Sequence, residues 1–374
     1  MAGYTRRELI ERSLAGAGAL TIGALLLQAC GSDSKSPATT GGATTTTTGG
    51  ASTTAGSTSP TSAGSIPDTL TKAGLQLSWT HSVQFGGSYL ALDRKYYAQE
   101  GIDITLSPGG PNVAGDAQTV SGAVLMNISA GDGVARSNEQ GAKLKIVGMQ
   151  YQKSPQTLLS LKDKDITKPQ DLVGKRIAVS GADNPGLLAF LKTNGIEESQ
   201  VTLVPSQYDP AVLTADQADA IFCFYIDLPV ALEVQGIEHN TMLLADFGYN
   251  PASQTYTVLE SSLTGDKREL VKQLLRAEIR GWQDYQTDYL DAAKLAVSMF
   301  PDAGLDLPTQ EAQAKVQLDI MYSDVTAENG FAWFTDETVA DNLKLYEQLG
   351  ITGATADLFD RSLLEEIYAE GPKI

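Results

Sequence analysis

Cysteine and histidine are scarce in this chain, and their scarcity removes several kinds of chemistry. Among 374 residues there are two cysteines, Cys30 and Cys223, and two histidines, His81 and His239. Two cysteines cannot build a framework of disulfides. Neither histidine lies in a motif with the spacing of metal ligands. The sequence therefore contains no recognisable pattern for a structural or catalytic metal.

Positive charge is also under-represented. The chain has 27 Lys and Arg against 45 Asp and Glu, a formal net charge of -18 at pH 7. This balance argues against nucleic acid, and against an anionic membrane surface, as the main partner. The chain also lacks a phosphate-binding loop, a G-x-G-x-x-G motif after a strand and a recognisable Ser/His/Asp arrangement. We therefore expect a protein that is not an enzyme and that carries no cofactor.

One apolar run near the N-terminus is too short for a permanent membrane span. It covers residues 14–27, is rich in small residues and follows Arg6-Arg7. These features indicate that residues 1–29 form a signal peptide. The arginine pair resembles a twin-arginine export signal, but neighbouring glutamates make the region less basic than usual. An ordinary Sec signal therefore stays open.

The end of this run resembles a bacterial lipobox, Leu27-Gln28-Ala29-Cys30. The resemblance implies cleavage before Cys30 and attachment of diacylglycerol to its nucleophilic thiol. Several acyl chains on one residue anchor a protein more firmly than one chain. Residues 30–70 are mostly Gly, Ser, Thr and Ala without apolar periodicity, which predicts a flexible tether. We expect an exported protein, lipid-anchored through Cys30 to the outer face of the bacterial cytoplasmic membrane.

Residues 75–106 predict the unit around which the folded part is organised. The first residues, up to Trp79, alternate as in a strand. A helix is expected to begin after Gly86-Gly87 and to end at Gly101. Ile102–Leu106 then alternates again. A strand-loop-helix-strand unit of this length predicts a parallel strand pair with ligand-binding groups beyond the strand ends.

Several motifs lie in and just after this unit: Trp79, Gly86-Gly87, Tyr89-Leu90-Ala91-Leu92, Tyr96-Tyr97, Glu100-Gly101-Ile102 and Pro108-Gly109-Gly110. Together they resemble type II periplasmic binding proteins, in particular their thiamine-pyrimidine-precursor and nitrate, sulfonate and taurine branch. The resemblance covers residues 75–349. It implies a substrate-binding lipoprotein of an ABC importer, with a membrane permease and an ATPase as partners. Eukaryotic pyrimidine-precursor synthases of this fold have a cysteine cluster near Cys223, which this chain lacks.

The alternation of predicted strands and helices indicates an α/β fold with mostly parallel sheets flanked by helices. The segment Ile166–Val179 matches a family pattern that precedes the second lobe. We place lobe 1 at residues 71–170 plus 256–374 and lobe 2 at residues 171–255, joined by two crossovers. A cleft between two such lobes binds ligand and closes by a hinge. We expect a monomer.

Aromatic residues at strand ends are the strongest candidates for contacts with a ligand. Trp79 offers a flat face for stacking and an N–H donor. In the strand Ala220–Tyr225, alternation places Cys223 and Tyr225 on one face, which predicts that Tyr225 faces Trp79 across the cleft. Two such aromatics would clamp a planar heterocycle. Asp227 would accept a hydrogen bond from an amine or ring N–H, or cap the following helix.

The other candidate ligand-binding residues are polar or aromatic and lie in loops or on the adjacent helix: His81, Gln84, Tyr89, Asn112, Asn127 and Asp132. For His81 a turn cap, and for Tyr89 ordinary packing, remain open. The aromatics and the acidic chain favour a thiamine-related pyrimidine or a flavin-like ring as the small-molecule ligand. Nitrate, sulfonate or taurine stay open, because helix N-termini bind anions without Arg or Lys. A sensor lipoprotein or an enzyme of the same fold are further alternatives.

Overall fold

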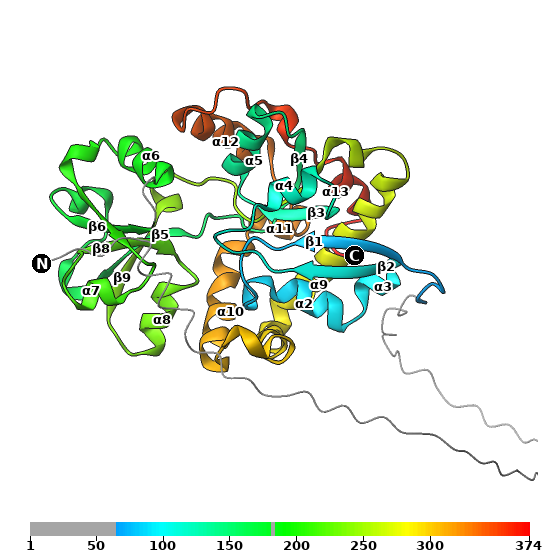
Figure 1. Ribbon diagram of the computed structural model, residues 1–374, viewed down its shortest axis with the longest axis horizontal. Helices are drawn as coiled ribbons and strands as arrows, with labels where there is room; N and C mark the ends of the chain where they lie inside the picture. Colours follow the sequence, from blue (N-terminus) through cyan, green and yellow to red (C-terminus); the bar gives the residue numbers. More distant parts are fainter. Residues whose placement is uncertain (1–64, 181–183) are drawn as a thin grey trace, which may run out of the picture. The chain divides into compact units, whose positions relative to one another are not determined.

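Two five-stranded sheets carry the fold (Figure 1). The computed structural model describes residues 65–180 and 184–374. The predicted signal peptide, the lipidation site at Cys30 and the tether as far as residue 64 lie outside the described residues. Both sheets belong to one compact unit, Ser62–Ile374. No helix in the described part of the chain is long and apolar enough to cross a membrane.

The first sheet has the strand order β2-β1-β3-β10-β4. Its strands are β1 (Thr71–Gln76), β2 (Ile102–Ser107), β3 (Met126–Ser129), β4 (Leu144–Met149) and β10 (Thr255–Leu259). Strand β1 pairs in parallel with β2 and β3, whereas β10 pairs antiparallel with β3 and β4. Every strand of this sheet except β10 therefore runs in the same direction.

The second sheet repeats this plan with the strand order β7-β6-β8-β5-β9. Its strands are β5 (Gln156–Leu161), β6 (Arg176–Ser180), β7 (Thr202–Ser206), β8 (Ala220–Phe224) and β9 (His239–Leu243). Strand β6 is parallel to β7 and β8, whereas β5 is antiparallel to β8 and β9. In each sheet the reversed strand is the first one after the chain changes sheets. The predicted α/β class with mostly parallel sheets is confirmed.

The first crossover lies earlier in the chain than the sequence predicts. The lobe 1 boundary predicted at residue 170 would include β5 (Gln156–Leu161). That assignment is wrong for this strand, because Leu158 of β5 pairs with Phe222 of β8 and with Met242 of β9 in the second sheet. An apolar strand carries no local mark of its sheet when its partners are distant in sequence. The chain returns to the first sheet between β9 and β10.

Helices cover both sheets, and Figure 1 draws the second sheet (green) with α6 on one side and α7 and α8 on the other. The helices of the second lobe are α6 (Pro185–Thr193), α7 (Ala211–Thr214) and α8 (Leu228–Val234). The remaining helices belong to the first lobe: α2 (Gly86–Asp93), α3 (Tyr96–Gln99), α4 (Gly115–Val120), α5 (Gly131–Glu139), α9 (Gly265–Met299), α10 (Leu307–Met321), α11 (Asp324–Asn329), α12 (Asp336–Gln348) and α13 (Ser362–Ile367). Short 3₁₀ turns connect several of them.

One helix prediction needs correction. The single helix expected between Gly86 and Gly101 is broken into α2 and α3, because Lys95 adopts a left-handed φ of 61°. A second break lies within α9, where the non-helical backbone angles of Asp288 (φ -110°, ψ 26°) divide it into two helical segments. Neither position carries a proline, so the usual sequence signal for a break is missing.

The glycines of α2 allow that helix to lie directly on α9. A Cβ at Gly87 would lie 2.0 Å from the ring of Trp282, and a Cβ at Gly281 would lie 2.1 Å from the Gly87 carbonyl oxygen. Any larger side chain would separate the helices. This explains the Gly86-Gly87 pair, which the sequence analysis interpreted only as a helix start. The contact fixes the helix that follows the Trp79 loop.

A buried carboxyl group reinforces the same contact. The side chain of Glu278 on α9 is fully buried. It accepts hydrogen bonds from Ser88 Oγ at 2.9 Å, Tyr256 OH at 2.7 Å and Trp282 Nε1 at 3.3 Å, and also from Tyr97 OH. Burial raises the pKa of Glu278. The group joins α2, α3, α9 and β10, so the frame beneath the first sheet is tightly connected.

Candidate ligand-binding site

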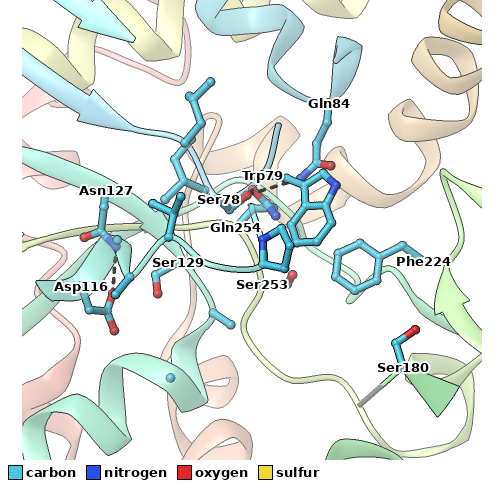
Figure 2. Close-up of a pocket in the computed structure, with 18 of the residues that line it drawn as sticks. Ser78, Trp79, Gln84, Asp116, Asn127, Ser129, Ser180, Phe224, Ser253 and Gln254 are labelled. Atoms are coloured by element: carbon cyan, nitrogen blue, oxygen red, sulfur yellow. Dashed lines mark hydrogen bonds between the residues drawn. The ribbon is translucent and has the colours of Figure 1, made fainter. Parts of the chain in front are cut away.

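A cavity of about 960 Å³ opens where residues from both sheets converge (Figure 2). The first lobe contributes Trp79 from the loop after β1, and the second lobe contributes Phe224 at the end of β8. The other lining residues are Leu77, Ser78, Gln84, Pro111, Val113, Ala114, Gly115, Asp116, Ala117, Asn127, Ile128, Ser129, Ala130, Gly133, Arg136, Ser137, Ser180, Ser206, Gln207, Tyr208, Asp227, Ser253 and Gln254. This volume is at the upper end for sites that enclose drug-sized molecules.

Hydrogen bonds of the neighbouring Ser78 support the loop that carries Trp79. Strand β1 ends at Gln76 rather than at Trp79, so the indole projects past the sheet edge. Beneath it, Ser78 Oγ donates to Gln254 Oε1 at 2.9 Å and accepts from Gln84 Nε2 at 3.4 Å. The side chain of Trp79 is 44% exposed. A supported but uncovered indole is suited to contact a flat ligand.

Gly109 contacts the backbone of the Trp79 loop directly. Its N–H donates to the carbonyl oxygen of Trp79 at 2.8 Å. A Cβ at Gly109 would lie 2.4 Å from the Leu77 carbonyl oxygen and 2.7 Å from the Trp79 nitrogen. Both are backbone atoms and cannot rotate away. The Pro108-Gly109-Gly110 motif therefore brings two loops of the cavity wall into direct backbone contact.

Replacing Gly109 by alanine is expected to lower the free energy of unfolding by about 1–3 kcal/mol, because the added methyl group forces the two loops apart. Urea denaturation measures the change. Gly133→Ala is the matched control, since no atom lies within 4 Å of the Cβ it would add. Equal stability of the two variants would show that the close backbone contact at Gly109 is not required.

The second-lobe wall is formed at the carboxyl ends of three parallel strands. Ser180, Ser206 and Phe224 are the last residues of β6, β7 and β8. Ser180 and Ser206 are direct partners in the register of β6 and β7. The buried Ser206 Oγ has no hydrogen-bond partner within the described ranges. A ligand group in the cavity can supply the missing partner.

Tyr208 and Asp227 form a polar pair beside Phe224. Tyr208 OH donates to Asp227 Oδ2 at 3.1 Å and accepts from the Phe224 backbone N–H at 3.0 Å. Tyr208 adopts a left-handed φ of 60°, which costs energy in a residue other than glycine. Burial raises the pKa of the Asp227 carboxyl group to about 6. The strained backbone at Tyr208 thus positions its hydroxyl group, which in turn positions the Asp227 carboxylate at the cavity wall.

The first-lobe wall contains a second polar network. Asp116 Oδ1 accepts from Asn127 Nδ2, and Asp116 Oδ2 accepts from Ser137 Oγ, both at 2.8 Å. The other end of the Asn127 amide accepts from Thr119 Oγ1 at 2.8 Å. Asn127 is buried and lines the cavity, and its amide donates to Asp116. The positively charged donor of this wall is Arg136, whose Nη2 donates to the Leu349 carbonyl oxygen at 3.2 Å.

The prediction that Tyr225 faces Trp79 is wrong, because Phe224 occupies that position. Strand β8 ends at Phe224, and the Tyr225 N–H turns away to the Pro155 carbonyl oxygen at 2.7 Å. The predicted strand Ala220–Tyr225 therefore extends one residue too far. Tyr225 packs against the core of the first lobe instead, and Cys223 is buried.

Four other candidate residues lie outside the cavity lining. Tyr89 is fully buried, and its hydroxyl lies 3.1 Å from His81 Nδ1. The His81 ring stacks on Phe300 with centroids 3.5 Å apart, and burial lowers its pKa. Asn112 is exposed in the loop between two lining residues. Asp132 lies one residue before the lining Gly133, and burial raises its pKa.

Four predicted residues are therefore brought together at the cavity: Trp79, Gln84, Asn127 and Asp227. Four further lining residues are not indicated by the sequence patterns: Phe224, Tyr208, Asp116 and Arg136. The carboxyl-end rule applied to Trp79 would also have indicated the loop after β7, where Tyr208 lies. Arg136 carries no such signal, because it is an ordinary helical arginine until the fold brings α5 to the cavity.

The cavity wall is weakly acidic in the described part of the chain. Its charged side chains there are Asp116, Asp227 and Arg136. Among residues 65–180 and 184–374, no group of three His, Cys, Asp or Glu side chains is arranged to hold a metal ion. The arrangement provides aromatic faces, hydroxyl groups, two carboxyl groups and one guanidinium for a single organic ligand.

Comparison with known proteins finds relatives of this chain that bind small molecules. The chain is 27% identical to the riboflavin-binding protein RibY of Chloroflexus aurantiacus over 297 residues, 78% of this chain and 84% of the relative. It is 22% identical to a formylaminopyrimidine-binding protein of Halalkalibacterium halodurans over 225 residues, 58% of this chain and 67% of the relative.

Solved structures show the same fold. The periplasmic aliphatic sulphonate binding protein SsuA of Escherichia coli superimposes with a TM-score of 0.56 at 17% identity, covering 75% of this chain and 91% of that one. This likeness establishes the fold of type II periplasmic binding proteins. The NMT1/THI5-like family profile matches residues 82–288, more than half of the 374 residues. The chain therefore belongs to the NMT1/THI5-like family.

Proposed function

We propose that this protein is the extracytoplasmic solute-binding component of an ABC importer and that it captures a planar heterocycle in the cavity between its lobes. The observation that carries the proposal is the presence of aromatic side chains from both lobes in one cavity, Trp79 from the first and Phe224 and Tyr208 from the second. A ring held between them contacts both lobes only when the lobes are closed. Binding then shifts the open–closed equilibrium towards the closed form that a permease recognises.

The size and charge of the cavity favour a flavin-like or pyrimidine ring over a small anion. A volume of about 960 Å³ far exceeds what nitrate or taurine requires. The charged groups among the described lining residues are two carboxyl groups and one guanidinium. Their combined charge therefore gives an anionic ligand little net electrostatic attraction. The named ligands of the two relatives, riboflavin and formylaminopyrimidine, are both heterocycles.

Asp227 gives the proposal a second contact. Tyr208 donates to one of its carboxylate oxygens, Oδ2, and the residue lines the cavity. A carboxylate oxygen accepts hydrogen bonds but cannot donate one when ionised. It therefore suits a ring N–H or an exocyclic amine, groups that flavins and aminopyrimidines carry and nitrate does not.

A thermal-shift panel tests the proposal, because a ligand that binds only the folded protein stabilises it by about 2.7 kcal/mol at a concentration of 100 Kd. The probes are riboflavin, formylaminopyrimidine, taurine, an alkanesulfonate and nitrate. We expect a rise in Tm with riboflavin or formylaminopyrimidine and none with the anions. A rise with the anions alone would contradict the proposal.

The anion alternative rests on one specific feature. The first turn of α5 reaches the cavity through Gly133, and Arg136 follows on the same helix. Backbone N–H groups at a helix start attract anions. Asp116, which the same wall places beside Ser137 of this helix, opposes that attraction. For this reason we rank a sulfonate, taurine or nitrate ligand second.

Nucleophilic catalysis by Cys223 is disfavoured. The thiol of Cys223 is buried, and burial raises its pKa well above the ordinary value, which disfavours the nucleophilic thiolate. A sensor lipoprotein would use the same ligand chemistry and differ only in its partner. Uptake of labelled ligand by cells with and without the protein separates transport from sensing.

The anchoring proposal concerns residues outside the described part of the chain. We propose export, cleavage before Cys30 and lipidation of that residue, because the lipobox-like Leu27-Gln28-Ala29-Cys30 precedes a long Gly/Ser/Thr-rich segment. Cys30→Ser is expected to move most of the protein from the membrane fraction to the soluble fraction, since its acyl chains are lost. Immunoblots of the two fractions measure the change.

Cys223→Ser is the matched control, because it removes the second cysteine of the chain without touching the lipobox. It is expected to stay with the membrane. A Cys30→Ser protein that sediments with membranes as wild type does would exclude the lipid anchor.

A further inference from the structure

The two ends of the cavity differ in chemistry. In Figure 2 Trp79 and Phe224 lie at one side, whereas Asp116, Asn127 and Ser129 lie at the opposite side. The first end presents aromatic surface together with the polar pair Tyr208 and Asp227, whereas the second end presents hydrogen-bonding groups without an aromatic ring. A ring at the aromatic end would leave the polar end for a second part of the ligand.

The polar end contains groups that are held by hydrogen bonds and have further bonding capacity. Asp116 is fixed by Asn127 and Ser137, each at 2.8 Å. A carboxylate offers about four acceptor sites, so about two remain for groups in the cavity. One N–H of Arg136 donates to the Leu349 carbonyl oxygen, and the guanidinium has four other N–H donors. Ser129 adds a hydroxyl group at the cavity wall.

Acceptors and donors line the same cavity here, with Asp116 hydrogen-bonded to Ser137, the neighbour of Arg136 on α5. That combination matches hydroxyl groups, which donate and accept at once. A phosphate group accepts but does not donate when fully ionised, and it would lie beside the Asp116 carboxylate. We propose that Asp116, Ser129 and Arg136 form a hydroxyl subsite for a neutral polyhydroxylated arm attached to the ring. The inference rests on the proposed function, since it needs a ring at the aromatic end.

Three flavins that share one ring system test the subsite. Riboflavin carries a polyhydroxylated arm, lumiflavin carries a methyl group in its place, and flavin mononucleotide carries the arm with a terminal phosphate. Dissociation constants come from quenching of flavin fluorescence. We expect riboflavin to bind at least about tenfold more tightly than either of the others, because each lost charge-assisted hydrogen bond costs about tenfold or more.

The variant Asp116→Asn keeps the shape of the side chain and its contact with Asn127 but loses the charge. It is expected to weaken riboflavin binding about tenfold while leaving lumiflavin binding unchanged. Unchanged lumiflavin binding also demonstrates that the variant is folded. Ser121→Ala, at the exposed far end of α4, is the control and should bind all three flavins as wild type does.

The outcomes separate the subsite from the function. If riboflavin and lumiflavin bind equally well, or if flavin mononucleotide binds more tightly than riboflavin, the hydroxyl subsite is wrong and the planar-ring function stands. If Asp116→Asn weakens both riboflavin and lumiflavin equally, the residue supports the fold rather than the arm. If none of the three flavins binds, a flavin-type ligand and the subsite fail together.

Discussion

Replacing Trp79 by alanine is expected to weaken riboflavin binding about 30-fold, and Phe224→Ala is expected to have a similar effect. Both side chains line the cavity, one from each lobe, and Trp79 is 44% exposed and free to stack. Aromatic anchors of this kind contribute about 2 kcal/mol each when truncated, which corresponds to about 30-fold in Kd. Titration by flavin fluorescence quenching measures both variants.

The matched comparisons are Trp79→Phe and Leu290→Ala. Trp79→Phe retains a flat ring and should recover most of the affinity. Leu290 is an exposed residue of α9 that lies outside the cavity lining, so its truncation should leave the Kd unchanged. If Trp79→Ala binds riboflavin as wild type does, the indole is not a stacking surface.

Removing the charge of Asp227 is expected to weaken binding about tenfold or more at pH 7.5 and to abolish its pH dependence. The pKa of the carboxyl group is about 6 in the unliganded protein. A ligand N–H binds the ionised form, so below pH 6 binding must displace a proton. In the wild type the affinity should therefore fall by up to tenfold for each pH unit below 6. Asp227→Asn should give a flat profile.

Tyr208→Phe tests the hydrogen bond between Tyr208 and Asp227 separately, through its effect on the pH dependence of binding. The Tyr208 hydroxyl group stabilises ionised Asp227 by donating to it at 3.1 Å, and this contact lowers the pKa of the carboxyl group. Without it, the fall in affinity should begin at a higher pH than in wild type. Asp163→Asn, an exposed residue of the second lobe, serves as the charge control. An affinity that rises as the pH falls would mean that protonated Asp227 donates to the ligand instead.

Much of the fold follows from local patterns in the sequence. The strand predicted from Ile102 begins there as β2, and the helix expected to follow Asp227 begins at Leu228. Alternating apolar residues and a proline in the first helical turn are strong local signals. The sheet to which β5 belongs could not be predicted, because its partners in β8 and β9 lie about 60 to 90 residues later in the chain.

Site residues that directly follow a strand end could be predicted from the sequence. Site residues whose position depends on loop conformation could not. Trp79 and Asp227 follow β1 and β8, so the carboxyl-end rule finds them. Phe224 and Tyr225 differ by one position, and the residue at which β8 ends decides which of them reaches the cavity. Tyr208 depends on a left-handed backbone conformation that its sequence does not announce. Side-chain placement at such points is a property of the folded loops.

The crystal structure of the protein bound to riboflavin tests the central claim most directly, since the claim is that one planar ring contacts aromatic side chains of both lobes. We predict that the flavin ring lies in the cavity in van der Waals contact with Trp79 and Phe224, with a ring N–H donating to Asp227. A ring that contacts only one lobe, or that lies outside this cavity, would contradict capture of a planar heterocycle between the lobes.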